Sequence, residues 1–116
     1  GTYMVAGAVT KGDITIKGAR LEHMHALTDK LKETGVKIEN LISSRHTRRN
    51  TVNNGIRIKA GARLRPVDII TMPYPGFPTD MQAQFMSLMA TVPGLSVITE
   101  KVYPQRFMHI AEFLRM

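Results

Sequence analysis

Apolar positions recur along this chain with two different periods, and each period predicts a type of element. Residues 2–10 are small and apolar, which favours a buried helix with Gly12 as its C-terminal breaker. A short buried strand is the alternative for the same stretch. Polar and apolar residues then alternate over 13–17, with two isoleucines on one face, so this segment predicts a strand that Gly18 ends.

Helical spacing returns over residues 20–34, and we predict a helix that Gly35 closes. The segment carries His23 and His25, which on a helix point about 200° from one another. Two such side chains cannot chelate one metal ion, so we interpret both as exposed or packing residues. The predicted inward positions are Leu21, Met24, Leu27, Thr28 and Leu31.

Short alternating segments at 36–39 and 55–59 predict two strands, and 36–61 as a whole has the pattern of an antiparallel hairpin. The residues between the two strands, 43–54, are polar and basic with almost no apolar content, so we expect a basic loop there. A further strand is predicted at 67–70.

A proline-rich segment and a helix follow. Residues 73–78 contain three prolines and a glycine, which excludes regular secondary structure. Thr79 and Gln82 are spaced as a capping box, so we predict Thr79 as the N-cap of a helix that Pro93-Gly94 ends. The apolar stripe of that helix is Met81, Phe85, Leu88, Met89 and Val92.

The pattern ends with a strand at 95–99 and a helix at 106–116 whose predicted inward face is Phe107, Ile110, Ala111 and Leu114. The predicted order is therefore helix, strand, helix, three strands, helix, strand, helix. Amphipathic helices that alternate with short strands bury their apolar faces against a sheet. The fold class is therefore α/β, with helices packed on a sheet.

Length and composition bound this architecture. The chain has 116 residues, enough for one domain and too few for two full-sized ones. It contains no cysteine, which excludes a disulfide scaffold, a thiolate metal site and a cysteine nucleophile supplied by this chain. No apolar run approaches the roughly 20 residues of a membrane-spanning helix. The chain begins Gly-Thr-Tyr-Met and ends Leu-Arg-Met, and we expect it to be cut from something longer.

The net charge of +7 is concentrated in one stretch. No acidic residue lies between Glu39 and Asp68, and we call 45–65 the basic window. Basic residues neutralise phosphates, which makes nucleic acid one candidate partner. The window has no aromatic residues for stacking on bases, which favours a solvated loop and strand instead. Its basic residues are Arg45, Arg48, Arg49, Arg57, Lys59, Arg63 and Arg65.

Two residues are candidates for chemistry, although no phosphate-binding or metal-binding motif is present. Asp80 follows the proline-rich segment directly, in the first turn of the expected helix. A carboxylate there complements the helix dipole, which is one sufficient explanation. The other is that a stiff loop holds Asp80 at a pocket edge as a general base or hydrogen-bond acceptor. Arg106 ends a charged, aromatic turn at 100–106, where it either binds a phosphate or carboxylate or lies on a helix surface.

Three segments resemble signatures of one enzyme family. The sequence at 73–85, Pro-Tyr-Pro-Gly-Phe-Pro-Thr-Asp-Met-Gln-Ala-Gln-Phe, is similar to a long and specific signature of the UDP-N-acetylglucosamine 1-carboxyvinyltransferases. Residues 96–109 resemble a second signature, at the family's usual distance from the first. Residues 1–18 match a third, so the resemblance covers nearly the whole chain.

The resemblance implies an enolpyruvyl transferase of peptidoglycan synthesis, a cytoplasmic enzyme without a cofactor. Such an enzyme transfers the enolpyruvyl group of phosphoenolpyruvate to the 3-hydroxyl of UDP-N-acetylglucosamine and releases phosphate. The implied fold is an inside-out α/β barrel built from β-α-β-α-β-β repeats, with residues 1–116 as a fragment of one domain. The family's Lys-Asn pair, its cysteine-bearing loop and its other phosphoenolpyruvate-binding residues match nothing in this chain.

The resemblance also implies roles for three residues. Asp80 matches an aspartate thought to deprotonate the sugar hydroxyl, Val102 a residue whose backbone meets the sugar nucleotide, and Arg106 an arginine close to the phosphoenolpyruvate site. The 116-residue chain alone is expected to be inactive. The alternatives are a stand-alone, non-catalytic α/β module and a nucleic-acid binder that uses the basic window. A sibling transferase acting on shikimate 3-phosphate fits the segment 73–85 less well.

Overall fold

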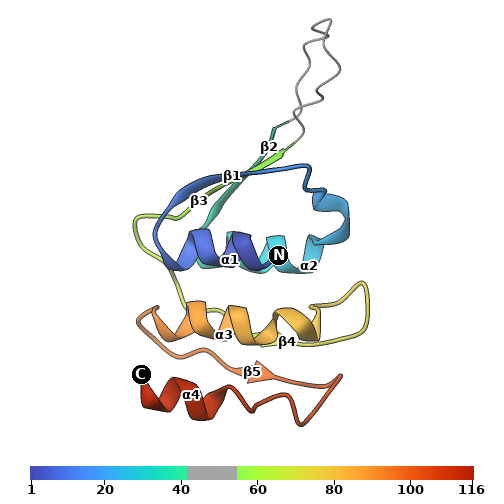
Figure 1. Ribbon diagram of the computed structural model, residues 1–116, viewed down its shortest axis with the longest axis vertical. Coiled ribbons are helices and arrows are strands. Elements are labelled where there is room, and N and C mark those ends of the chain that lie inside the picture. Colours follow the sequence, from blue (N-terminus) through green and yellow to red (C-terminus); the bar gives the residue numbers. More distant parts are fainter. Residues whose placement is uncertain (42–54) are drawn as a thin grey trace, which may run out of the picture.

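The structure, a computed structural model, describes residues 1–41 and 55–116 (Figure 1). The elements in chain order are α1 (Thr2–Val9), β1 (Asp13–Lys17), the 3₁₀ turn η1 (Leu21–His23), α2 (His25–Thr34), β2 (Lys37–Leu41), β3 (Gly55–Lys59), β4 (Ile69–Ile70), the 3₁₀ turn η2 (Thr79–Met81), α3 (Gln82–Ala90), β5 (Ile98–Thr99) and α4 (Ile110–Arg115). The predicted order of helices and strands is confirmed. The expected basic loop at 43–54 lies outside the described residues. Within the described ranges, no helix has the length and apolar character needed to cross a membrane.

β1, β3 and β2 form a three-stranded sheet in that order, and both pairings are antiparallel. The pairing of β2 with β3 confirms the predicted hairpin. Ile58 lies opposite Ile14 of β1 and Ile38 of β2, so isoleucines gather on one face. In the central strand Ile56 and Ile58 are fully buried, because strand side chains two positions apart share a face.

The two N-terminal helices lie between this sheet and α3 (Figure 1). α1 contacts β1 and β3 on one side and α3 on the other. Gly7 permits the close approach to the sheet, because a Cβ there would lie 2.8 Å from Cδ1 of Ile14. The helix predicted at 2–10 is therefore confirmed over the alternative strand. One core joins these layers, made of Met4, Val5, Ala8, Leu27, Leu31, Val36, Ile56, Ile58, Val67, Ile69, Phe77, Met81, Phe85, Leu88, Met89 and Val92.

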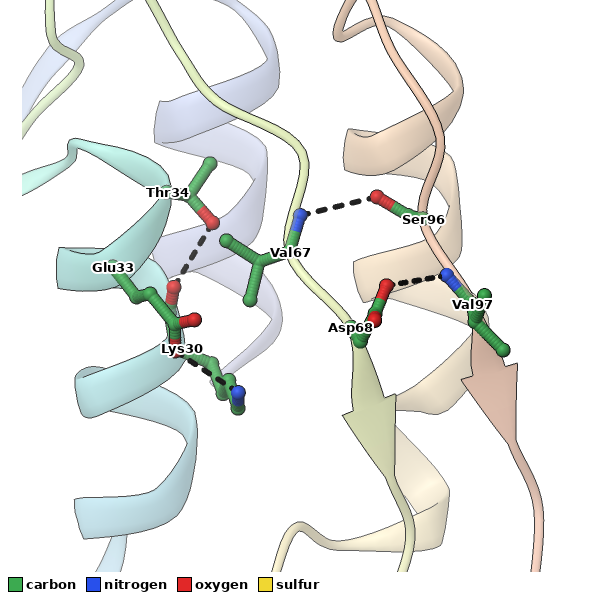
Figure 2. Close-up of polar contacts among 7 residues, drawn as sticks. All are labelled: Lys30, Glu33, Thr34, Val67, Asp68, Ser96 and Val97. Carbon is green, nitrogen blue, oxygen red and sulfur yellow. Dashed lines mark hydrogen bonds and ion pairs between the residues drawn. The ribbon is translucent and has the colours of Figure 1, made fainter.

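β4 and β5 form a separate parallel pair beside α3 (Figure 1). Each has two residues and is shorter than predicted, because side chains take over the hydrogen bonds at the start of both strands. Figure 2 shows the Val67 N–H donating to the Ser96 hydroxyl oxygen (3.1 Å) and the Val97 N–H donating to Asp68 Oδ1 (2.7 Å). These two hydrogen bonds join the two chain segments just before β4 and β5 begin to pair.

The end of α2 is tied to the segment that leads into β4. Gly35 has a φ of 104°, in the left-handed region that glycine favours, and it closes the helix as predicted. The Thr34 hydroxyl donates to the Lys30 carbonyl oxygen at 2.9 Å (Figure 2). The Thr34 carbonyl oxygen accepts from the Arg65 N–H, also at 2.9 Å. The long connection from β3 is thereby held against the helix.

Two helix boundaries near the N-terminus differ from the prediction. Lys11, not Gly12, has the positive φ (54°) that follows α1, so Gly12 is not the conformational breaker. The second predicted helix begins at His25 instead of residue 20, since Met24 (φ −133°, ψ 27°) leaves the helical region. The 3₁₀ turn before it places residues three apart on one side, which lets Leu21 and Met24 both pack against the core.

The last helix is shorter and more exposed than predicted. α4 begins at Ile110, and none of its residues is buried. Of the predicted inward face, Phe107 is only partly buried, Ala111 is exposed, and Leu114 is 84% exposed. α4 lies at the edge of the molecule, where no described element covers its outer face (Figure 1). The predicted buried face is therefore wrong for the described residues.

Candidate active site

The segment 73–78 forms a loop that is closed at its base and anchored to α3. The Met72 N–H donates to the Phe77 carbonyl oxygen at 3.0 Å, across the base of the loop. The buried Phe77 ring meets Phe85 of α3 nearly edge to face, with 5.4 Å between ring centroids. The predicted absence of regular structure is confirmed, and the anchored loop leads directly to Asp80.

Thr79 does not cap α3 as predicted. It is the first residue of η2, and its hydroxyl donates to Oε2 of Glu100 at 2.8 Å. The bond is charge-assisted because its acceptor is a carboxylate, and the Thr79 oxygen accepts no capping hydrogen bond from a backbone N–H of α3. Gln82, the other half of the expected capping box, is fully buried, and neither side-chain amide atom has a hydrogen-bond partner within the described ranges. α3 therefore begins without a side-chain cap.

Asp80 lies on the wall of a half-open pocket of about 280 Å³. The residue is exposed, so a molecule in the pocket can reach its carboxylate. The wall is completed by Gly1 immediately before α1, by residues 22–27, by the loop residues 74–76 and 78, and by Met81.

The pocket offers groups that suit a polar ligand. Asp80 supplies a carboxylate acceptor, and the exposed His23 and His25 lie in the wall formed by η1 and α2. An exposed carboxylate can be approached directly by a ligand hydroxyl, which is one condition for a general base. In the part of the chain that the structure describes, no group of three or more His, Cys, Asp or Glu side chains is arranged to hold a metal ion.

Glu100 follows β5, and its carboxylate accepts four hydrogen bonds. Oε1 accepts from the Thr71 hydroxyl (2.6 Å) and from the N–H groups of Val102 (2.8 Å) and Tyr103 (2.9 Å). Oε2 accepts from the Thr79 hydroxyl (2.8 Å). Burial disfavours the charged form of Glu100, but these four donors outweigh it and lower its pKa from 4.5 to about 2. The side chain is therefore ionised at neutral pH.

Sequence reasoning missed this role of Glu100. Its hydroxyl donors lie 29 and 21 residues away along the chain, so no local pattern connects them with the carboxylate. The sequence offered a weaker signal, which was an acidic residue at the end of a strand and immediately before a turn. The carboxylate of such a residue can accept hydrogen bonds from the backbone N–H groups two and three positions later. The structure places Glu100 between the segment that carries Asp80 and the turn that carries Val102 and Arg106.

Val102 and Arg106 occupy the turn beyond Glu100 and do not line the pocket among the residues described. Val102 is 41% exposed, and its N–H is taken up by Glu100. The Arg106 guanidinium lies over the Tyr103 ring, 5.7 Å from its centroid, in a cation–π arrangement. Through Glu100, the backbone of Val102 is linked to Thr79, the residue next to Asp80.

In the described part of the basic window, Arg57 and Lys59 are paired with acidic residues. Arg57 forms a two-pronged contact with Asp13 at 2.8 Å for each bond and lies 3.7 Å from Glu39. Lys59 lies 3.5 Å from Asp13. The hydrogen bond from Arg57 is the main reason that the pKa of Asp13 is lowered. This favours a solvated strand here, while the three arginines within 45–49 lie outside the described residues.

Comparison with known proteins identifies relatives along the whole chain. The sequence model of the EPSP synthase (3-phosphoshikimate 1-carboxyvinyltransferase) family matches residues 1–116. The chain is 50% identical over all 116 residues to UDP-N-acetylglucosamine 1-carboxyvinyltransferase 1 of Staphylococcus aureus (strain MRSA252). It is also 50% identical to the protein of the same name from Staphylococcus epidermidis. In both cases it spans 25% of the relative's length.

A solved structure shows the same fold. The crystal structure of the enolpyruvyl transferase NikO from Streptomyces tendae matches 96% of this chain with a TM-score of 0.74, at 23% sequence identity. The match covers 24% of that protein. The prediction of an enolpyruvyl transferase-like α/β fold is therefore confirmed, as is the resemblance carried by the three signature segments.

Proposed function

The chain belongs to the EPSP synthase family, and we propose that it forms part of a UDP-N-acetylglucosamine 1-carboxyvinyltransferase. One observation carries the proposal: the 50% identity to enzymes of that name extends over all 116 residues. The chain spans a quarter of those relatives, so the complete reaction is proposed for a longer protein, in which residues 1–116 belong to one domain. A cytoplasmic location and a role in peptidoglycan synthesis are parts of the same proposal.

In the proposed reaction, Asp80 accepts the proton of the 3-hydroxyl of UDP-N-acetylglucosamine. The freed oxygen bonds to the enolpyruvyl carbon of phosphoenolpyruvate, and phosphate leaves as the product is formed. The exposure of Asp80 in a pocket supports this role, since a general base must lie within hydrogen-bond reach of the proton it takes. The rigid loop at 73–78 supports it as well, because positioning is a large part of catalysis.

The turn beyond Glu100 supplies two further proposed contacts. The N–H of Val102 is held by Glu100, which leaves its carbonyl oxygen for the sugar nucleotide. Arg106 offers a planar cation that binds a carboxylate or phosphate in two-pronged fashion, which suits phosphoenolpyruvate. The remaining groups that bind phosphoenolpyruvate are proposed to come from residues outside this chain.

Phosphate release tests the proposal. The full-length protein that carries residues 1–116 is incubated with phosphoenolpyruvate and either UDP-N-acetylglucosamine or shikimate 3-phosphate. We expect release with the first acceptor and none above background with the second. Release with shikimate 3-phosphate alone would assign the chain to a sibling activity of the same family. The isolated 116-residue chain should release no phosphate, because closure of a complete site is needed to orient both substrates.

A further inference from the structure

We propose that Glu100 is a positioning residue that holds the Asp80 segment and the Val102–Arg106 turn in one arrangement. The inference rests on the proposed function, because it assigns Glu100 a role through Asp80. Glu100 does not line the pocket among the described residues, so it acts through its neighbours and does not touch the substrate. Its importance follows from where its four hydrogen-bond donors lie.

The donors come from three separate places in the chain. Thr71 directly follows β4, Thr79 directly precedes Asp80, and the two N–H donors belong to the turn. One carboxylate therefore joins the base of the proline-rich loop, the residue next to the proposed base, and the turn. Thr71 adds a second link to the turn, because its hydroxyl oxygen accepts from the Lys101 N–H at 2.9 Å.

The arrangement requires an acceptor with two oxygens. Oε1 serves three donors and Oε2 serves the fourth, which an ionised carboxylate can do because it has about four lone-pair sites and no proton to place. Replacement by alanine removes all four bonds and leaves two hydroxyls and two N–H groups without this acceptor. Replacement by glutamine keeps one oxygen for three donors. The Thr79 hydroxyl can then rotate and accept from the new NH₂ group.

The structural consequence concerns Asp80 most directly. Thr79 and Asp80 are consecutive residues of a three-residue 3₁₀ turn, so a shift of Thr79 moves the carboxylate of Asp80. A misplacement of about 1 Å at a reacting group can cost about 10²-fold in rate. Glu100→Ala should therefore lower kcat by about 10²-fold, while Glu100→Gln should stay within about tenfold of the unchanged protein.

The experiment combines kinetics with hydrogen exchange in the full-length protein. The variants are Glu100→Ala, Glu100→Gln, Asp80→Asn and the double variant Asp80→Asn/Glu100→Ala. The matched control is Glu112→Ala, because Glu112 is exposed and contacts Arg115 of the same helix at 3.2 Å. The measured quantities are kcat, KM for UDP-N-acetylglucosamine, and amide exchange in residues 76–82 and 101–106.

A positioning role predicts results that general loss of stability does not. Once Asp80 is removed, the loss of Glu100 should change kcat by less than about threefold, because residues that act as a unit are not additive. Exchange should accelerate in both segments together in Glu100→Ala, recover in Glu100→Gln, and stay unchanged in Glu112→Ala. An equal loss of kcat in both backgrounds, or acceleration confined to one segment, would overturn the proposal.

The two proposals fail in distinguishable ways. A full-length protein that transfers no enolpyruvyl group refutes the proposed function, whatever Glu100 does. The exchange measurement is independent of turnover. If Glu100→Ala leaves exchange in residues 76–82 and 101–106 unchanged, the positioning role is refuted even in an active enzyme.

Discussion

The half of the molecule built on the three-stranded sheet buries its apolar side chains far better than the half that ends in α4. β3 is hydrogen-bonded on both sides, and Ile56 and Ile58 within it are fully buried. By contrast, β4 and β5 contribute two residues each, and Leu95 and Leu114 nearby are 82% and 84% exposed. Apolar side chains with this exposure contribute little hydrophobic stabilisation to the described part of the chain.

This difference in burial bears on which interactions keep the residues of the candidate site in place. Asp80 and Glu100 belong to the more open half, where hydrogen bonds between distant segments add to the core contacts of residues such as Phe77 and Phe85. A substitution in the sheet half should therefore mainly lower the free energy of unfolding. A substitution at the candidate site should mainly lower the turnover rate.

The largest effect is expected at Asp80. Asp80→Asn in the full-length protein keeps the side-chain shape but removes the proposed general base, a contribution typically worth about 10²–10⁴-fold in rate. The residue is exposed, so the free energy of unfolding should change by less than about 1 kcal/mol, the size of a helix-dipole effect. Steady-state turnover and denaturant unfolding measure the two quantities. Near-normal turnover would leave the helix dipole as the full explanation of Asp80.

Core truncation should show the opposite behaviour. Ile58→Ala removes a fully buried side chain from the central strand, and such changes cost about 2–5 kcal/mol in the free energy of unfolding. Leu114→Ala is the matched control, since its side chain is 84% exposed in α4 and should lose less than about 0.5 kcal/mol. Urea denaturation of the 116-residue chain provides the comparison. A cost for Leu114→Ala similar to that for Ile58→Ala would mean that α4 is buried in solution.

A smaller loss of stability is expected at Thr79. Thr79→Ala removes a hydrogen bond to an ionised carboxylate, a type of bond worth about 1.5–3 kcal/mol, and partial exposure should place the loss near the lower value. Thr91→Ala serves as control, because the Thr91 hydroxyl donates only to the Leu88 carbonyl oxygen in the last turn of α3. Thermal unfolding at neutral pH distinguishes the two. Equal losses would argue that the contact with Glu100 adds nothing beyond an ordinary helix-end bond.

The most subtle effect concerns pH. The pKa of Glu100 in the folded protein, about 2, lies below its ordinary value of 4.5, so its contribution to stability is complete above about pH 4.5 and is lost as pH falls towards 2. Glutamine cannot titrate. The midpoint of thermal unfolding should therefore fall less steeply over this pH range in Glu100→Gln than in the unchanged chain. Parallel profiles for the two proteins would contradict the lowered pKa.

Local periodicity was sufficient to predict the order of the helices and strands. It failed where contacts between distant segments determine the hydrogen bonding or the burial of a residue. The alternating isoleucines of β1 and β3 predicted strands correctly, because burial on one face of a sheet imposes a period of two. Thr79 and Gln82 matched a local capping pattern, but the Thr79 hydroxyl donates to a carboxylate 21 residues further along the chain, and α3 has no side-chain cap. The predicted inward face of the last helix was wrong for the described residues, since no residue of α4 is buried and Leu114 is 84% exposed.

The candidate site divides in the same way. The sequence could single out Asp80 as a candidate, because the proline-rich loop immediately before it is a local feature, and the structure places Asp80 on the wall of a pocket. Glu100 was not predictable, since its role depends on how β4 and β5 are paired, which the sequence pattern does not specify. The positions of Val102 and Arg106 relative to the pocket likewise depend on the shape of the turn.

The turn after Glu100 is held through main-chain N–H groups, which every amino acid except proline possesses. Substitutions at positions 102 and 103 can therefore alter size, charge or aromatic character without removing the bonds that shape the backbone. Proline at either position would delete a donor. The side chains at 102 and 103 could therefore be varied to change which acceptor substrate the proposed enzyme prefers, while the backbone of the turn stays the same. Libraries at these two positions that omit proline should contain a high proportion of folded members.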